Sequence, residues 1–231
     1  MRILGIIPAR GGSKGVPKKN IRSFAGKPLI GYTIESALNS QINEIIVSTD
    51  DKLIADISIS LGARVPFIRP YDISSDTSSS IDVCIHALHA MENINNFNYD
   101  AIMMLQPTAP FRTCEDINAS IDILKRNSSS DSVISVVNVL AHHPARMKYL
   151  DNGILIDPPF CEVYENQNRQ ELQPMYIRNG AIYLTKRNTL INRSFKGANC
   201  MAYIMPEIRS ANIDTLQDFE FAEWIYNKYI K

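Results

Sequence analysis

The sequence lacks any long apolar run, and no stretch approaches the ~18 residues that a membrane-spanning helix requires. Its opening residues, 1–10 (MRILGIIPAR), become polar too soon for a secretory signal, so we interpret them as a buried first strand. The cysteines lie far apart and form no C-x-x-C pair, which is typical of reduced thiols. They are Cys84, Cys114, Cys161 and Cys200. We therefore expect a cytoplasmic protein with no membrane partner.

Net charge is also absent, because 24 Lys and Arg residues balance 24 Asp and Glu residues. This balance argues against a general binder of nucleic acid or of membrane surfaces. Acidic residues are missing from the start of the chain until Glu35, and that stretch carries seven cations. They are Arg2, Arg10, Lys14, Lys18, Lys19, Arg22 and Lys27. The excess favours a local anion site, although a solvated basic loop would give the same pattern.

Short apolar runs alternate with helical patterns along most of the chain, which indicates an α/β fold with a Rossmann-like, doubly wound, mostly parallel sheet. A length of 231 residues fits one compact α/β domain over residues 1–231, or one domain with a small appendage. We predict strands at 3–7, 44–48, 101–105, 132–137, 181–184 and 201–205. We predict helices at 28–38, 51–61, 79–91, 115–125 and 215–229. Thr215 and Asp218 resemble a capping box at the start of the last helix, with Asp in place of Glu or Gln.

The composition and periodicity of the sequence change in residues 141–176. This segment contains paired histidines, paired prolines and the dipeptide Asn152-Gly153, and it shows little helical periodicity. We interpret it as an arm or β-hairpin lobe inserted into the domain.

Ligands of open α/β sheets bind outside the carboxyl ends of the strands, which selects the loops 8–20, 48–51 and 106–110. The loop 8–20 combines three glycines with Arg10 and Lys19. Glycines let backbone N–H groups approach a phosphate, and the cations neutralise its charge. Neither a G-x-x-x-x-G-K-[ST] loop nor a G-x-G-x-x-G motif is present. The pattern favours triphosphate binding over a plain turn.

Motifs along nearly the whole chain resemble the acylneuraminate cytidylyltransferases, the family of CMP-sialic acid synthetases and of relatives that act on legionaminic or similar nonulosonic acids. They are IPARGGSKGVPKKN (7–20), GKPLIGYTIESAL (26–38), VSTDD (47–51), RPYDISSDTSSS (69–80), LQPTAPFR (105–112), HHP (142–144), NGAIYL (179–184) and NIDTLQDFEFAE (212–223). Single motifs are weak, but the full set in this order is specific.

The resemblance implies a role for particular residues. Those implied to bind the nucleotide are Arg10, Gly11, Gly12, Ser13, Lys19, Asn20, Arg69 and Ser80. Those implied to bind the sugar are Gln106, Arg146, Arg169, Asn179 and Gly180, with Arg146 and Arg169 reaching the sugar carboxylate across a dimer interface. Catalysis would depend on Arg10, Lys19 and Asp214. The arm 141–176 would then serve dimerisation, and the partner would be a second copy.

The resemblance also implies Mg²⁺, held in the family by an Asp-x-Asp near the last helix. Here the motif is Asn212-Ile213-Asp214, so Asp214 keeps the role of ligand while Asn212 offers only a neutral oxygen. Asp214 could instead cap the helix, and Asp50 or Asp51 could supply the carboxylate.

The expected reaction joins CTP to an acidic nine-carbon sugar of the N-acylneuraminate type and releases pyrophosphate. A nucleotidyltransferase for another sugar and a catalytically idle nucleotide binder are the alternatives. Plain structural roles are open for three of the predicted positions: a turn at Arg69-Pro70, a loop bonded to itself at Gln106, and a tight turn at Asn179-Gly180. The identity of the nonulosonic acid depends on the shape of the pocket.

Overall fold

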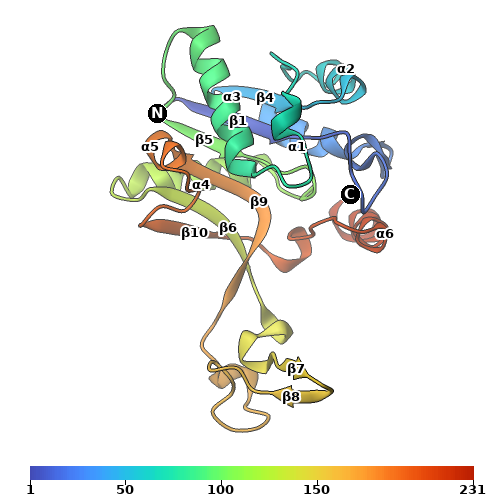
Figure 1. Cartoon of the computed structure of the whole chain (residues 1–231), viewed down its shortest axis with the longest axis vertical. Helices are drawn as coiled ribbons and strands as arrows, with labels where there is room; N and C mark the ends of the chain where they lie inside the picture. Colours follow the sequence, from blue (N-terminus) through green and yellow to red (C-terminus); the bar gives the residue numbers. More distant parts are fainter.

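A computed structural model describes all 231 residues. Its central sheet has six strands in the order β10-β6-β9-β5-β1-β4 (Figure 1). The strands are β1 Ile3–Pro8, β2 Ser23–Phe24, β3 Lys27–Pro28, β4 Glu44–Ser48, β5 Ala101–Met104, β6 Ser132–Asn138, β7 Tyr149–Asp151, β8 Ile154–Ile156, β9 Tyr176–Lys186 and β10 Cys200–Ile204. The helices are α1 Leu29–Leu38, α2 Lys52–Ser60, α3 Ser80–Asn95, α4 Cys114–Arg126, α5 Arg187–Ile191 and α6 Leu216–Ile225.

The prediction of a mostly parallel α/β sheet is confirmed, and the only antiparallel member of the large sheet is β9, which pairs with β5 on one side and β6 on the other. No crossover helix separates β6 from β9. The chain leaves and re-enters the sheet at the same end, so β9 must run opposite to β6. Only residues 181–184 of this strand were predicted from the sequence, whereas the strand begins at Tyr176.

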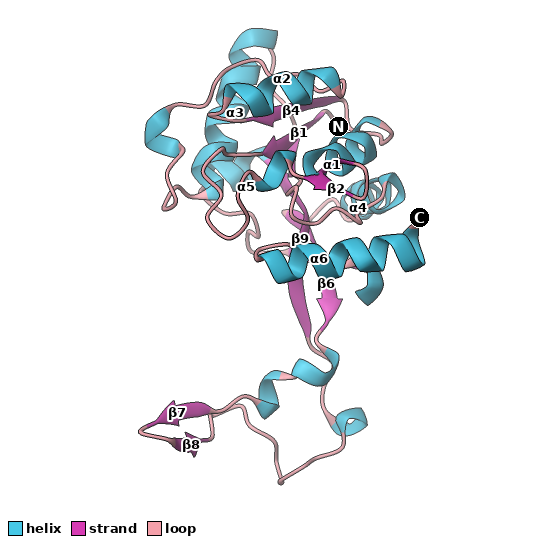
Figure 2. Cartoon of the chain, turned by 90° about the vertical axis from the view of Figure 1, so that its right-hand side faces the viewer, coloured by secondary structure: helices cyan, strands magenta, loops and turns pink.

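Helices cover both faces of the sheet (Figure 2). On one face α1 and α4 bury Ile30, Ile34 and Ile121 against β1 and β5. On the other face α3 buries Leu88 and Met91 against the same strands. Alternate residues of a strand point to opposite faces, which is why these strands are apolar along their whole length. α5 was not predicted from the sequence.

A third apolar cluster lies at the carboxyl edge of the sheet and determines how the functional loops sit. Val16 of the first loop and Phe24 of β2 pack with Phe219 of α6, and Phe24 meets Phe219 edge-on at 5.3 Å between ring centres. Ile213 is fully buried in the same cluster. The cluster therefore binds the first loop to the segment that precedes α6, although the two are almost 200 positions apart in sequence.

Residues 139–175 leave the sheet and lie at the far end of the molecule, beyond the paired ends of β6 and β9 at Asn138 and Tyr176 (Figures 1 and 2). The segment contains the β7–β8 hairpin, whose turn places Asn152 and Gly153 at φ 47° and 86°. Two consecutive left-handed residues match the twist of a two-residue hairpin. The excursion thus nearly coincides with the predicted arm 141–176. No helix of the structure is both long enough and apolar enough to cross a membrane.

Candidate active site

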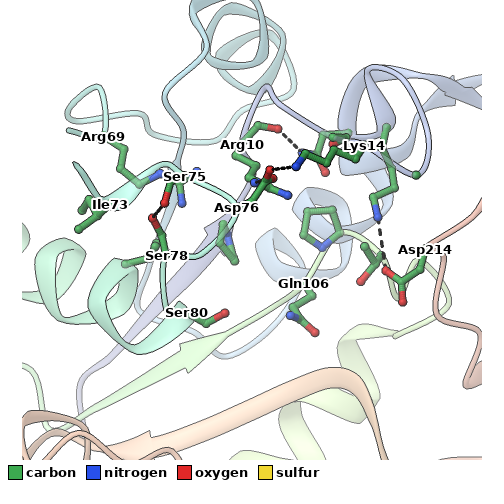
Figure 3. Close-up of a pocket in the computed structure, with 18 residues that line it drawn as sticks. Arg10, Lys14, Arg69, Ile73, Ser75, Asp76, Ser78, Ser80, Gln106 and Asp214 are labelled. Atoms are coloured by element: carbon green, nitrogen blue, oxygen red, sulfur yellow. Dashed lines mark hydrogen bonds and ion pairs between the residues drawn. The ribbon is translucent and has the colours of Figure 1, made fainter. Parts of the chain in front are cut away.

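A cleft of about 380 Å³ opens at the carboxyl edge of the sheet (Figure 3). Its walls come from the loops after β1 and β5, from the segment between β4 and α3, and from the residue just before α6. The lining residues that sequence analysis selected are Arg10, Ser13, Lys19, Asn20, Arg69, Ser80, Gln106 and Asp214. The fold therefore brings residues from both halves of the sequence to one place, as the rule for open α/β sheets predicts.

The loop after β1 is held in shape by its own neighbours. The Gly11 N–H donates to Asp50 Oδ1 at 3.0 Å, and the buried Asn20 donates from Nδ2 to the Arg10 carbonyl at 3.0 Å. Gly15 lies so close to the segment before α6 that a Cβ there would stand 2.0 Å from the Asp214 carbonyl oxygen. Glycine is therefore required for this close approach. Gly11 and Gly12 belong to this loop but do not line the cleft.

Lys19 connects the loop to the Asn212-Ile213-Asp214 segment. Its Nζ donates to the Ile213 carbonyl at 2.9 Å and stands 3.5 Å from Asp214 Oδ1. The Lys19 side chain is only 15% exposed, whereas that of Asp214 is 66% exposed. The lysine is thus fixed by a backbone acceptor, and the carboxylate remains accessible from the cleft.

Arg69 carries an almost completely buried guanidinium at the cleft wall. The Nε and Nη2 atoms of this residue have no hydrogen-bond partner, and the nearest carboxylate oxygen, Asp50 Oδ1, is 3.7 Å away. Burial lowers the pKa of Arg69, and Asp50 opposes that shift. The alternative of a solvated turn residue is therefore wrong. Unpartnered buried donors at a cleft wall suit an anionic or carbonyl-bearing ligand.

Asp76 forms ion pairs with two cations of the first loop. Its carboxylate pairs with Arg10 Nη1 and with Lys14 Nζ, and these hydrogen bonds hold the pKa of Asp76 below its usual range (Figure 3). Lys14 was one of the cations of the acid-free stretch but was not predicted as a site residue, and Asp76 was not predicted at all. The position of Asp76 inside the motif 69–80 was the available signal.

Gln106 lines the cleft, and Gly180, which does not line it, lies directly behind the Gln106 side chain. Gly180 has φ +76°, and a Cβ there would stand 2.8 Å from Gln106 Oε1. The Gln106 side chain makes no hydrogen bond within the protein, so the alternative of a loop bonded to itself does not apply to it. Asn179 is buried: its Oδ1 accepts from Ser135 Oγ at 2.6 Å and its Nδ2 donates to Ser210 at 3.0 Å.

Asn179 and Gly180 lie within β9, not in a turn before it, which corrects the alternative interpretation of this pair. The register of β6 against β9 shifts between Ile134 and Val136, opposite these two residues. The Ser135 hydroxyl fills the gap by accepting from the Ile182 N–H at 2.8 Å. The Asn179 side chain supports this bulge from inside, so a direct contact of that side chain with sugar would require it to give up internal partners.

The Asn212-Asp214 pair has one carboxylate that could bind a divalent cation. Asn212 Nδ2 donates to Asp214 Oδ2 at 2.7 Å. Thr215, not Asp214, caps α6, and its capping box with Asp218 is confirmed. Asp51 Oδ1 caps α2 through the N–H groups of Leu53 and Ile54, and Asp50 Oδ1 accepts from the Gly11 N–H. Neither of these two alternative sources of a carboxylate lines the cleft, whereas Asp214 does. A single accessible carboxylate suits Mg²⁺, which is bound through one or two carboxylates plus substrate phosphates.

Arg146 and Arg169 lie on the excursion 139–175, away from the cleft of their own chain. Arg146 donates to Glu162 at 3.0 Å and to the Gln167 carbonyl at 2.9 Å. Arg169 lies in a short turn at 169–171. Neither lines the cleft, so one chain alone does not assemble the full predicted set.

The chain is similar in sequence to known proteins over almost its whole length. Residues 4–194 match the family model described as "Cytidylyltransferase". The chain is 40% identical over 230 residues to the CMP-N,N'-diacetyllegionaminic acid synthase of Legionella pneumophila, covering 96% of this chain and 95% of the relative. It is 33% identical to the pseudaminic acid cytidylyltransferase of Campylobacter jejuni, covering 98% and 97% of the two chains.

An N-acylneuraminate cytidylyltransferase of Escherichia coli is 35% identical over 98% of this chain, which spans 52% of that longer protein. Among solved structures, CMP:2-keto-3-deoxy-manno-octonic acid synthetase complexed with CTP superposes with a TM-score of 0.73 at 17% identity, over 100% of both chains. The latter likeness concerns the fold alone. The family match, on this fold and with this cleft, identifies a nucleotidyltransferase. Within that class, the chain belongs to the cytidylyltransferase family, and it is similar to the relatives that make CMP-nonulosonic acids.

Proposed function

We propose that the protein transfers CMP from CTP to the anomeric hydroxyl of an N-acylneuraminate-type nonulosonic acid and releases pyrophosphate. One observation carries the proposal: Arg10, Lys14, Lys19 and Arg69 converge on one cleft that also holds Asp214. Such a cation-rich cleft suits a triphosphate, and we assign the end at Gln106, behind which Gly180 lies, to the acceptor. The names of the similar proteins support the choice of nucleotide and of acceptor class.

The residues of the cleft divide the work in this proposal. Arg10 and Lys19 bind the triphosphate and offset charge that develops on the α-phosphate and on the leaving pyrophosphate. Arg69 and Ser80 hold the cytidine end, and Gln106 orients the acceptor. No side chain acts as a nucleophile, because positioning and charge neutralisation supply most of the acceleration in such transfers.

We propose Mg²⁺ as the divalent cation, with the Asp214 carboxylate as its protein ligand and the side-chain amide oxygen of Asn212 as a second, weaker ligand. Bound there, the cation would withdraw charge from the phosphate oxygens. Asn212 would have to turn its oxygen outward and give up its hydrogen bond to Asp214. The amide carries no charge, so the site depends on Asp214 more than an Asp-x-Asp pair would.

The test is a panel with CTP, UTP or GTP, Mg²⁺, and sialic, legionaminic, pseudaminic or octulosonic acid, with pyrophosphate release as readout. We expect turnover with CTP and at least one nonulosonic acid. Release with the octulosonic acid alone would favour a different sugar class. No release with any pair, together with tight CTP binding, would favour the idle nucleotide binder.

We also propose a homodimer in which residues 141–176 form the contact and bring Arg169 and Arg146 to the cleft of the partner. The support is chemical: this segment exposes Leu150, Leu155 and Val163 at 72%, 70% and 89%. Large exposed apolar surfaces of this kind mark interfaces. Because CTP is a cytoplasmic metabolite, we place the enzyme in the cytoplasm.

A further inference from the structure

Arg112 is the most deeply buried cationic side chain of the protein, and the proposed function leaves it without a role. It lies just before α4 and is 2% exposed. Its Nη1 donates to the Ala181 carbonyl at 2.7 Å and to the Gln106 carbonyl at 3.4 Å. The Nε and Nη2 atoms have no hydrogen-bond partner in the protein.

No carboxylate forms an ion pair with Arg112. The nearest acidic influence comes from Asp116, which already pairs with Arg209 and accepts from the Tyr203 hydroxyl at 2.6 Å. Burial lowers the pKa of Arg112 to about 9, and Asp116 opposes this shift only in part. The guanidinium therefore keeps its charge at neutral pH, and that charge is not neutralised by its own surroundings.

An unneutralised buried charge is costly, and an apolar side chain of similar length would avoid that cost. A purely structural link between two backbone carbonyls needs hydrogen-bond donors but no charge. Burying the charge of Arg112 therefore destabilises the folded protein in a way that its two backbone contacts do not require. An anion that binds nearby would offset the cost.

The contacts of Arg112 place it behind the acceptor end of the cleft. The pairing of β5 with β9 stops at Met104 and Tyr183, and beyond that point Arg112 binds the Ala181 carbonyl in place of a strand partner. Ala181 follows Gly180, over which the Gln106 side chain lies. One guanidinium therefore holds both backbone segments that form this end.

We propose that Arg112 is a positioning residue for the acceptor: it fixes Gln106 and Gly180 and supplies a buried positive charge that favours an acceptor carrying a carboxylate. The proposal rests on the proposed function, because it requires an acidic acceptor at that end. Arg112 does not line the cleft, so it acts on the acceptor through the backbone of Gln106 and Ala181 and not by direct contact.

The test separates the charge of Arg112 from its structural contacts. The dissociation constants of an accepted nonulosonic acid and of its primary amide are measured in the presence of the α,β-methylene analogue of CTP, so that no chemistry intervenes. We expect the wild-type protein to prefer the acid, and Arg112→Met to reduce that preference about tenfold. The affinity for the CTP analogue should change by less than about threefold.

Two further variants keep the test decisive. Arg112→Lys retains the charge but lacks the planar guanidinium whose Nη1 contacts both carbonyls, so it should keep the preference for the acid while lowering kcat. Arg187→Met, which breaks the ion pair with Glu92 on the opposite side of the molecule, controls for general destabilisation and should leave the preference unchanged. If Arg112→Met does not fold, loss of the preference in Arg112→Lys would overturn the proposal.

An unchanged acid preference in Arg112→Met, or equal losses of CTP and acceptor affinity, would also show a merely structural role. Failure of the proposed function looks different, because the wild-type protein would then bind no nonulosonic acid at all. The wild-type measurement therefore comes first.

Discussion

At the scale of single residues, Arg10 and Lys19 carry the positive charge of the first loop into the cleft. We expect Arg10→Ala or Lys19→Ala to lower kcat/KM for CTP by at least ~100-fold, or about 2.7 kcal/mol of transition-state stabilisation. Lys18→Asn is the matched control: Lys18 belongs to the same loop but does not line the cleft, and Asn tolerates its positive φ of 53°. Near-normal turnover in both alanine variants would show that the phosphates bind elsewhere.

Asp76 occupies the place where an incoming anion would meet Arg10 and Lys14. A triphosphate must displace this carboxylate, and the carboxylate can return when pyrophosphate leaves. We therefore expect Asp76→Asn to lower the product-inhibition constant of pyrophosphate about fivefold, because the two cations lose their internal competitor. Asp72→Asn, on the same segment but outside the cleft, should leave it unchanged. Weaker inhibition and a higher Mg²⁺ requirement in Asp76→Asn would instead make Asp76 a metal ligand.

The Asn212-Asp214 pair allows a test of the cation site. Asp214→Asn leaves no carboxylate in the pair, so we expect turnover to be lost while CTP binding falls less. Asn212→Asp adds a second charge and should lower the Mg²⁺ concentration for half-maximal rate. If Asn212 faces the sugar instead, that variant would raise the acceptor KM, because its new charge would repel the acceptor carboxylate. Separate titrations of Mg²⁺ and acceptor distinguish the two outcomes.

At the scale of elements, the first turn of α6 positions Asp214. Asp218 Oδ2 accepts from the Thr215 N–H at 2.8 Å and from the Asp214 N–H at 3.1 Å. Thr215→Ala should cost about 1 kcal/mol, or about 2–4 °C in Tm, and should raise the Mg²⁺ requirement because the segment before the helix loosens. Thr113→Ala breaks the equivalent capping box of α4. It should lower Tm similarly without changing the Mg²⁺ requirement.

The elements that sequence analysis predicted well are those whose apolar spacing follows directly from burial. The strands β1, β4 and β5 lie within one residue of their predicted bounds, since both of their faces are covered by helices. The bulged strand β9 was predicted only in part, because its first half pairs across a register shift that Ser135 repairs with a side chain. A hydroxyl that substitutes for a backbone group leaves no periodic signal.

In the candidate site too, local sequence patterns were predictive, whereas contacts between segments far apart in sequence were not. The cations of the first loop were visible as an acid-free stretch, and the motif resemblance selected Arg69, Gln106 and Asp214. That Arg69 has unpartnered donors, or that Asp76 competes for the loop, depends on distances between segments far apart in sequence. Such distances follow from packing of the whole domain, which no local spacing encodes.

At the scale of the whole molecule, the excursion 139–175 gives the reason to expect a dimer. Its apolar side chains are exposed in one chain, and Arg169 does not reach the cleft of that chain. A two-fold contact between these segments would cover the apolar surface and offer each cleft the arginines of the partner. We expect a dimeric mass in solution by sedimentation, and a monomer with full activity would contradict this arrangement.

Mixed dimers test whether the sites are shared between subunits. An Arg169→Ala chain and an Arg10→Ala chain, each inactive by itself, are co-expressed in equal amounts with different tags. About half of the dimers then contain one chain of each kind, and each of these holds one cleft with an intact Arg10 from one chain and an intact Arg169 from the other. The mixture should show about a quarter of the wild-type rate, and dimers purified through both tags about half. If the doubly tagged dimers stay inactive while the singly tagged parents fold and bind CTP, Arg169 serves its own chain or none.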